Sequence, residues 1–312
     1  MSSAHPNPAA LEITSDDLIR QRLRARRISL TGKQPVSSVI AGVHSSRFRG
    51  RGVDYVESRN YEIGDDIRNL DWRVTARTGK PHTKVFQEER ERPVLVIMDM
   101  SDSMYFGTRG CLKVVQAARL TALVGWAAVR RGDRIGCLMY HNGRHYEVRP
   151  AGGRRGALRL VNVMVKAGQE FAPGHIAPAS GSMEAAVKRA RRIARPGSLI
   201  FLVSDFYGLT DDCHRHVSYL RQHNDVVACR VVDPIELELP PPGAYPISDG
   251  QTQGMLDLRS APARERYRQF LRDGEQRYTD LCNRHALTRM TLRTPDDPTD
   301  ALSRVFSYRD AA

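Results

Sequence analysis

The stretch PVLVIMDMSDSM, residues 93–104, indicates the fold class of this 312-residue chain. Its first six residues form an uninterrupted apolar run, which is typical of a strand buried on both faces of a parallel sheet. An acidic, Ser-rich loop follows, and then a strongly apolar helix predicted over residues 111–131. Strand, polar loop and apolar helix in this order indicate an α/β domain whose functional loop lies at the carboxyl end of the strand.

The same alternation continues to the end of the chain. Further strands are predicted at 135–140, 145–150, 198–205, 225–233 and 287–294, with helices at 156–168, 182–194, 211–224, 261–284 and 300–308. This pattern predicts a doubly wound, mostly parallel sheet with helices on both faces, spanning residues 93–312. Residues 1–42 are predicted to be a tail and a short helix, forming an N-terminal extension that packs on this domain. Residues 43–92 form a third segment, without a long periodic pattern.

The positive charge of the chain is concentrated in its middle third. Residues 109–200 carry 17 basic and 4 acidic side chains, an excess equal to the whole net charge of +13. Such a region suits nucleic acid, phosphate or an acidic protein, although solvated helix faces give the same pattern. Aromatic residues suited to base stacking are scarce there, which argues against single-stranded nucleic acid.

Composition also bears on location. The longest apolar stretch, 121–129, is much shorter than the roughly 20 residues of a membrane-spanning helix. The first 17 residues lack the basic-then-apolar layout of a secretory leader. Five widely spaced cysteines without a C-x-x-C pair indicate reduced, buried thiols. We therefore expect a cytoplasmic protein without membrane insertion.

Oxygen-bearing side chains gather where two predicted strands end. Asp99, Ser101 and Ser103 follow the first strand at every second position, and Asp205 ends the strand at 198–205. Parallel strands bring these loops to one edge of the sheet, where hard oxygen ligands suit Mg²⁺ or Mn²⁺. The alternative is that the two serines only cap and shape the turn.

This arrangement resembles the metal-ion-dependent adhesion site of von Willebrand factor A domains. The chain also resembles domain of unknown function (DUF) family 58, through the blocks YEIGDDIRNLDW at 61–72, TAR at 75–77 and FQEER at 86–90. The resemblance implies a von Willebrand factor A-like fold without an established enzymatic activity. It also implies a role as adaptor or partner of a MoxR-type AAA+ ATPase, in the short cytosolic form of the family.

The resemblance departs from the adhesion-site pattern at one position. Gly181 stands where such sites take a Thr from a second loop. Ser180 or Ser182 would need a loop shift to supply the missing hydroxyl. The implied metal site is therefore degenerate, and its occupancy stays open.

The family segment contains charged residues whose role is open: Asp65, Asp66, Arg68, Asp71, Trp72 and Arg77. Neighbouring carboxylates suggest metal-dependent hydrolysis, but no nucleophile or general base is placed beside them. Interleaved arginines and a Trp favour a structural, docked segment or a partner-binding face. No phosphate-binding loop or hydrolase motif occurs in the chain.

From these observations we expect a non-enzymatic protein-interaction module that binds acidic protein groups, with a divalent ion as its cofactor. The alternative is a basic nucleic-acid-binding protein that uses residues 109–200.

Overall fold

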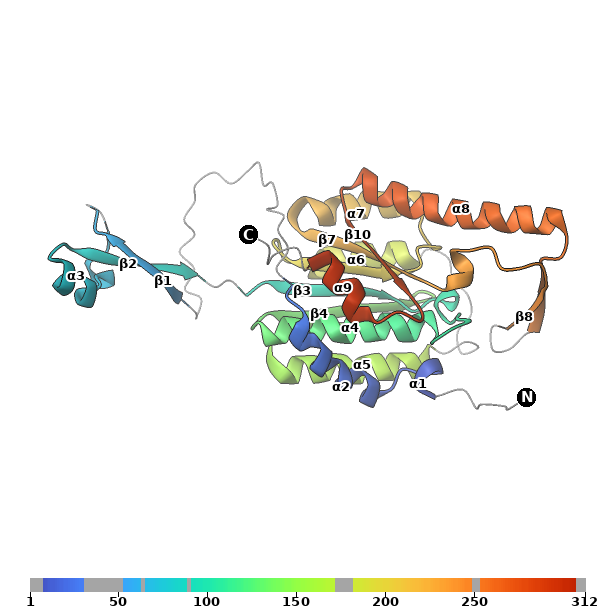
Figure 1. Ribbon diagram of the computed structural model, residues 1–312, viewed down its shortest axis with the longest axis horizontal. Coiled ribbons are helices and arrows are strands. Elements are labelled where there is room, and N and C mark those ends of the chain that lie inside the picture. Colours follow the sequence, from blue (N-terminus) through green and yellow to red (C-terminus); the bar gives the residue numbers. More distant parts are fainter. Residues whose placement is uncertain are drawn as a thin grey trace. The chain divides into compact units, whose positions relative to one another are not determined.

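The computed structural model describes residues 8–30, 53–62, 65–88, 91–171, 182–248 and 253–306 (Figure 1). The chain divides into two compact units. Unit 1 combines the N-terminal Met1–Ser38 with Arg92–Ala312, and unit 2 is Val39–Glu91.

A six-stranded sheet forms the centre of unit 1. Its strands are β3 (Pro93–Asp99), β4 (Arg134–His141), β5 (Arg144–Ala151), β6 (Leu199–Ser204), β7 (Asp225–Val232) and β10 (Thr288–Arg293). Their order is β10-β7-β6-β3-β4-β5, and every neighbouring pair is parallel except β4–β5. Along the chain, the sheet begins with β3 and adds β4 and β5 on one side of it. Strands β6, β7 and β10 then follow on the other side of β3. The order therefore reverses between β3 and β6, which is where α/β sheets commonly bind ligands.

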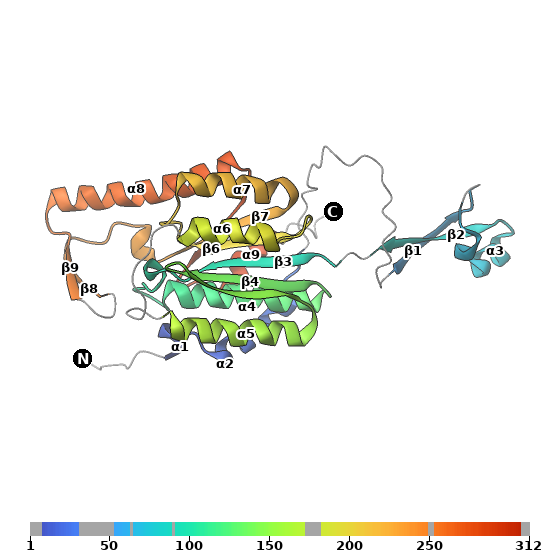
Figure 2. The ribbon, with the colours of Figure 1, turned by 180° about the vertical axis from the view of Figure 1, so that it is seen from behind.

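Helices cover both faces of the sheet, so the predicted doubly wound α/β architecture is confirmed (Figures 1 and 2). One face packs against α4 (Lys113–Arg130), α5 (Gly153–Glu170) and α9 (Pro298–Phe306), and α2 (Ser15–Arg24) packs on the outer side of α4 and α5. The other face packs against α6 (Ser182–Ile193), α7 (Asp211–His223) and α8 (Ala261–Arg284). None of the helices in the described ranges combines the length and apolarity needed to cross a membrane. All five cysteines are buried and free.

The N-terminal extension packs on α4, as predicted. Leu18 of α2 is buried, and its carbonyl oxygen accepts a hydrogen bond of 3.0 Å from Nε1 of Trp126. Asp17 and Arg119 join the same two helices through an ion pair of 2.6 Å. A short helix α1 (Pro8–Leu11) precedes α2, and a 3₁₀ turn η1 (Ala25–Arg27) follows it. Leu23, an apolar residue of α2, is exposed.

Shorter elements shape the loops around the sheet. The 3₁₀ turns η3 (Asp102–Met104) and η4 (Pro234–Glu236) follow β3 and β7. Strands β8 (Ala244–Ser248) and β9 (Gln253–Asp257) pair as an antiparallel hairpin.

Unit 2 is a small antiparallel ribbon with one short helix. Strand β1 (Val53–Asn60) pairs with β2 (His82–Glu88), and between them lie η2 (Ile67–Asn69) and α3 (Trp72–Thr78). The sequence did not reveal this ribbon. More than twenty residues separate its strands, so no short hairpin turn marks the pairing.

Candidate functional site

Asp99 lies at the carboxyl edge of the sheet, at the end of β3 and beside the end of β6. Its Oδ1 accepts a hydrogen bond of 2.8 Å from the backbone N–H of Ser101, and its Oδ2 accepts one of 2.6 Å from Oγ of Ser204. Burial, followed by the charge of Asp205, raises the pKa of Asp99 above its ordinary value, although the serine hydrogen bonds oppose this. No basic side chain in the described ranges forms an ion pair with Asp99, and its two oxygens are held by Ser101 and Ser204.

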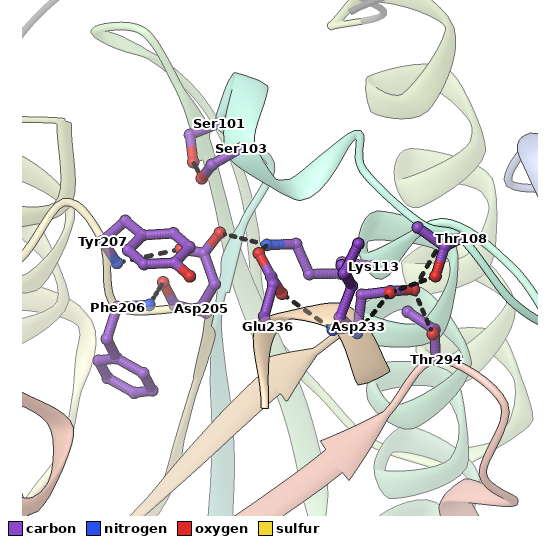
Figure 3. A network of polar contacts seen from close by, with 12 residues as sticks. Ser101, Ser103, Thr108, Lys113, Asp205, Phe206, Tyr207, Asp233, Glu236 and Thr294 are labelled. Carbon is purple, nitrogen blue, oxygen red and sulfur yellow. Dashed lines mark hydrogen bonds and ion pairs between the residues drawn. The ribbon is translucent and has the colours of Figure 1, made fainter. Parts of the chain in front are cut away.

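The two serines of the β3 loop point toward each other. Oγ of Ser101 and Oγ of Ser103 are 3.3 Å apart (Figure 3). Adjacent ligands of an octahedral ion at about 2.1 Å lie roughly 3 Å apart, so this pair alone is compatible with a shared ion. Gly181 and Ser180, in the second loop of the predicted site, lie outside the described residues.

Asp205 is bound differently, because a lysine already neutralises it. Nζ of Lys113 lies 2.9 Å from Oδ2 of Asp205 and 2.7 Å from Oε1 of Glu236 (Figure 3). The Lys113 side chain has no exposed surface, and that of Asp205 is 1% exposed. A buried charge of this kind is stable only when it is paired and hydrogen-bonded.

Aromatic faces complete the surroundings of the ammonium. Nζ of Lys113 lies 5.2 Å from the ring centroid of Tyr207 and 5.8 Å from that of Phe106, within the range of cation–π attraction. Burial alone would lower the pKa of Lys113, but the charges of Asp205 and Glu236 outweigh it and hold the pKa above its ordinary value. Lys113 is therefore an ammonium at neutral pH.

Glu236 links this ion pair to a second buried acid. Its Oε2 accepts a hydrogen bond of 2.9 Å from the backbone N–H of Asp233, which completes a capping box around η4. Burial raises the pKa of Glu236, against the attraction of Lys113. We consider Glu236 ionised, because both of its oxygens accept from donors and neither is left to carry a proton.

Asp233 in turn connects three segments of unit 1. Its carboxylate accepts hydrogen bonds from the N–H of Thr108 at 2.7 Å, from Oγ1 of Thr294 at 2.9 Å and from the N–H of Ile235 at 3.1 Å. The hydroxyl of Thr108 donates to the same carboxylate. The polar network therefore extends from Asp205 through Lys113, Glu236 and Asp233 to the loops after β3 and β10 (Figure 3).

The backbone after β6 is strained at one position. Phe206 has a φ of 64°, a conformation that bulky side chains rarely adopt. The N–H of Phe206 donates to Oγ of Ser204 at 2.9 Å, and the N–H of Tyr207 donates to Oδ1 of Asp205 at 3.1 Å. These bonds hold the turn that aims Asp205 at Lys113.

The four residues expected to ligate a divalent ion do not fit one together. The hydroxyls of Ser101 and Ser103 have a suitable spacing, but both oxygens of Asp99 accept hydrogen bonds and Asp205 is committed to an internal cation. In the described ranges no three His, Cys, Asp or Glu side chains converge as a metal-binding group. A Mg²⁺ or Mn²⁺ ion held by all four residues would lie against the Lys113 ammonium.

The acids of the family segment lie in unit 2, where each one fixes a turn. Asp71 caps α3 by accepting from the N–H groups of Arg73 and Val74, both at 3.2 Å, and from Oγ of Ser58 at 2.7 Å. Asp66 accepts from the N–H of Arg68, and Asp65 accepts from the N–H of Glu62 and pairs with Arg59 at 2.7 Å. These contacts give the three acids structural roles within the unit.

The apolar and basic residues of this segment point outward. Trp72 is 68% exposed and Ile67 is 64% exposed, while Arg68 and Arg77 are also exposed. The part that Trp72 was predicted to play, as a docking anchor or a partner contact, stays a prediction.

A basic groove lies between α6 and the edge strand β5 and was not expected as a defined site. It consists of two adjoining hollows of about 330 and 570 Å³, which share Arg189 and Arg192. The basic side chains that line it are Arg134, Arg144, His145, Arg149, Lys188, Arg189, Arg192 and Arg195. Glu147 is the single acid among the lining residues, and it contacts Arg189 at 3.0 Å and Arg149 at 3.8 Å.

Part of this groove carries uncompensated charge. Within the described ranges, Lys188, Arg192 and Arg195 form no ion pair with an acid. Tyr140 is the only Phe, Tyr or Trp among the lining residues and is 3% exposed, so the exposed His145 is the one open ring that the groove offers for base stacking. The sequence showed that residues 109–200 are basic, but it did not show that β5 and α6 bring these side chains together.

Comparisons with known proteins identify relatives of unknown function. The model of a family described as "Protein of unknown function DUF58" matches residues 57–277. Uncharacterized proteins of Mycobacterium tuberculosis and Mycobacterium bovis are each 31% identical over 238 residues, which is 76% of this chain and 73% of theirs.

Two solved structures are similar to part of the chain. The conserved hypothetical protein BatB from Bacteroides thetaiotaomicron has 15% identity and a TM-score of 0.44, over 69% of this chain and 97% of its own. A von Willebrand factor type A protein from Catenulispora acidiphila has 15% identity and a TM-score of 0.36, over 72% of this chain and 42% of its own.

Proposed function

The chain belongs to the family of unknown function DUF58, and from this premise and the charge of its surface we propose that it is a non-enzymatic protein-interaction module that binds acidic groups of a partner protein. The proposed partner is a MoxR-type AAA+ ATPase, the class of protein that the family resemblance implies. The basic groove between α6 and β5 is the observation that carries the proposal.

Charge complementarity supports an acidic partner. Lys188, Arg192 and Arg195 have no acidic partner in the described ranges, and Glu147 is the single carboxylate that lines the two hollows of the groove. Arginine forks match carboxylates in two-point hydrogen bonds. Complementary charge also accelerates the association of the two proteins and disfavours the binding of basic proteins. An acidic segment of a partner would therefore gain most by lying along the groove past these three side chains.

The acids at the carboxyl edge support a role without catalysis. The oxygens of Asp99, Asp205 and Glu236 are occupied by hydrogen-bond donors or by Lys113. None of them is placed as a free general base, which would need to face a substrate.

A direct experiment is capture of the purified ATPase from the source organism on the immobilised full-length chain. We expect the double variant Lys188→Glu/Arg192→Glu to weaken capture by roughly tenfold or more, because two charges that no acid compensates change from attractive to repulsive. The matched control is Arg26→Glu/Arg266→Glu, which makes the same change of net charge at two exposed positions outside the groove. Equal capture by the two double variants would contradict the groove as the binding surface.

Two competing hypotheses make different predictions, one for the capture assay and one for the binding of DNA. If a Mg²⁺ or Mn²⁺ ion at Asp99, Ser101 and Ser103 receives the partner's carboxylate, a chelator removes binding. If the chain is instead a nucleic-acid-binding protein that uses residues 109–200, duplex DNA binds with a steep negative slope of log affinity against log salt concentration. Stacking of several bases in the groove would rest on His145 alone, because Tyr140 is buried, and this favours the protein partner over single-stranded nucleic acid.

A further inference from the structure

We propose that the Lys113 ammonium is a tethered counter-ion that replaces a divalent cation at the carboxyl edge of the sheet, so that the edge is held together without metal. This inference rests on the contacts of Lys113 and is independent of the function proposed above. It concerns the site that the family resemblance assigns to Mg²⁺ or Mn²⁺.

The first argument is that the position of Nζ has the surroundings of a cation site. Two carboxylate oxygens, Oδ2 of Asp205 and Oε1 of Glu236, lie 2.9 and 2.7 Å from this one atom. Oxygen ligands surround Ca²⁺ at about 2.3–2.6 Å and Mg²⁺ at about 2.0–2.1 Å. A small contraction would convert the same two carboxylates into ligands of a divalent ion centred where the ammonium is.

The second argument is that the ammonium joins the same elements that an edge ion would join. Lys113 begins α4, Asp205 follows β6, and Glu236 ends the turn η4 after β7. The ion pairs therefore connect loops at the carboxyl ends of β3, β6 and β7, at the point where strand order reverses. A lysine side chain provides this link permanently, whereas an ion provides it only when bound.

The third argument is electrostatic exclusion. Asp205 was the predicted ligand that would bring the β6 loop to the metal, and its Oδ2 now bonds Nζ while its Oδ1 accepts from the N–H of Tyr207. A divalent ion within ligand distance of Asp205 would lie only a few ångströms from a buried positive charge. In an interior of low polarity that repulsion is strong, because little water screens it.

The experiment measures Mn²⁺ binding to the full-length chain by electron paramagnetic resonance and by the shift of the melting temperature. We expect the wild-type protein and Lys113→Arg to bind no stoichiometric Mn²⁺. Lys113→Met should gain one site, since the methionine side chain ends one atom earlier and leaves the Nζ position open between two carboxylates. With Mn²⁺ at a hundredfold excess over its dissociation constant, the melting temperature of Lys113→Met should rise by roughly 5–10 °C.

Two further variants locate the ion. The gain should disappear in Lys113→Met/Asp205→Asn, which lacks the ligand that Lys113 covers. Lys113→Met/Glu236→Gln has one buried negative charge fewer than Lys113→Met and is the second way to obtain a folded protein without the ammonium. This double variant should keep a weaker Mn²⁺ site.

The measurement of Mn²⁺ binding to the wild-type protein tests the proposal even if no Lys113 variant folds. One equivalent of Mn²⁺ bound to the wild-type protein and lost in Asp99→Asn or Asp205→Asn would overturn the proposal. A folded Lys113→Met that gains no Mn²⁺ would overturn it as well.

Discussion

Nζ of Lys113 lies 2.9 Å from Oδ2 of Asp205, although 91 residues separate the two positions and neither side chain has more than 1% of its surface exposed. This contact joins the start of α4 to the end of β6. It changes the expected role of Asp205 from that of a metal ligand to that of a partner in a buried ion pair. Stability and metal affinity at this edge should therefore both depend on one lysine.

Removing the ammonium should strongly destabilise unit 1. We expect Lys113→Met to lower the free energy of unfolding by about 3–5 kcal/mol, because Asp205 and Glu236 are left buried without a counter-charge. Urea unfolding of the full chain measures the loss. The control is Lys166→Met, whose side chain is 63% exposed and pairs with Glu170 on the surface of α5. Its effect should stay within about 0.5 kcal/mol, and an equal loss in both variants would contradict the role of the buried pair.

Asp233 should make the stability of unit 1 depend on acid pH. Burial acts to raise the pKa of Asp233, but the hydrogen bonds from Thr108, Ile235 and Thr294 outweigh it and hold the pKa below its ordinary value. A lowered folded-state pKa stabilises the protein above the pKa of the unfolded chain. This stability is lost as the pH falls from about 4 through the lower folded-state value.

The measurement for Asp233 is the midpoint of urea unfolding between pH 6 and pH 2.5. The wild-type midpoint should fall more steeply below pH 4 than that of Asp233→Asn. Asp212→Asn, at a side chain that is 61% exposed, is the control and should follow the wild-type curve. Parallel curves for the wild type and Asp233→Asn would contradict the assigned hydrogen bonds.

The same substitution at two helical glycines should have opposite effects. A Cβ at Gly274 of α8 would lie 3.4 Å from Nη2 of Arg230, an ordinary contact, whereas a Cβ at Gly156 of α5 would lie 2.5 Å from the carbonyl oxygen of Ala151. Gly274→Ala should therefore stabilise the protein by about 0.5–1 kcal/mol through helix propensity. Gly156→Ala should destabilise it by about 1–3 kcal/mol through overpacking. Thermal unfolding of the two variants, measured in parallel, tests both predictions. A change of stability in the same direction for both variants would contradict the packing around these glycines.

Unit 2 should depend on Asp71 more than on Trp72. Asp71 holds the start of α3 and bonds Ser58 of β1, so Asp71→Ala should cost about 1–2 kcal/mol of local stability. Hydrogen exchange of the β1 and β2 amides measures it. Trp72→Ala removes a side chain that is 68% exposed and should leave this exchange nearly unchanged. Faster exchange in Trp72→Ala than in Asp71→Ala would show that the indole, rather than the cap, holds the ribbon together.

The local sequence determined the elements of unit 1 and their class. Runs such as PVLVIM could be identified as buried strands because period and apolarity are local properties of the chain. Asn142 and Gly143 have φ angles of 42° and 80°, values that suit the Asn-Gly turn between β4 and β5. The position of Asp99 at the carboxyl edge followed from the same reasoning.

The tertiary structure decided which charges meet. A helix that is apolar nearly all round is buried, so a lysine at its start must be paired, and this signal could have marked Lys113 as part of the site. Its partners, however, are 92 and 123 positions away from it along the chain. The basic groove likewise exists only because α6 packs beside β5. Pairing of charges is a property of distance in space, and the sequence fixes the residues but not, by itself, which of them share a low-dielectric interior.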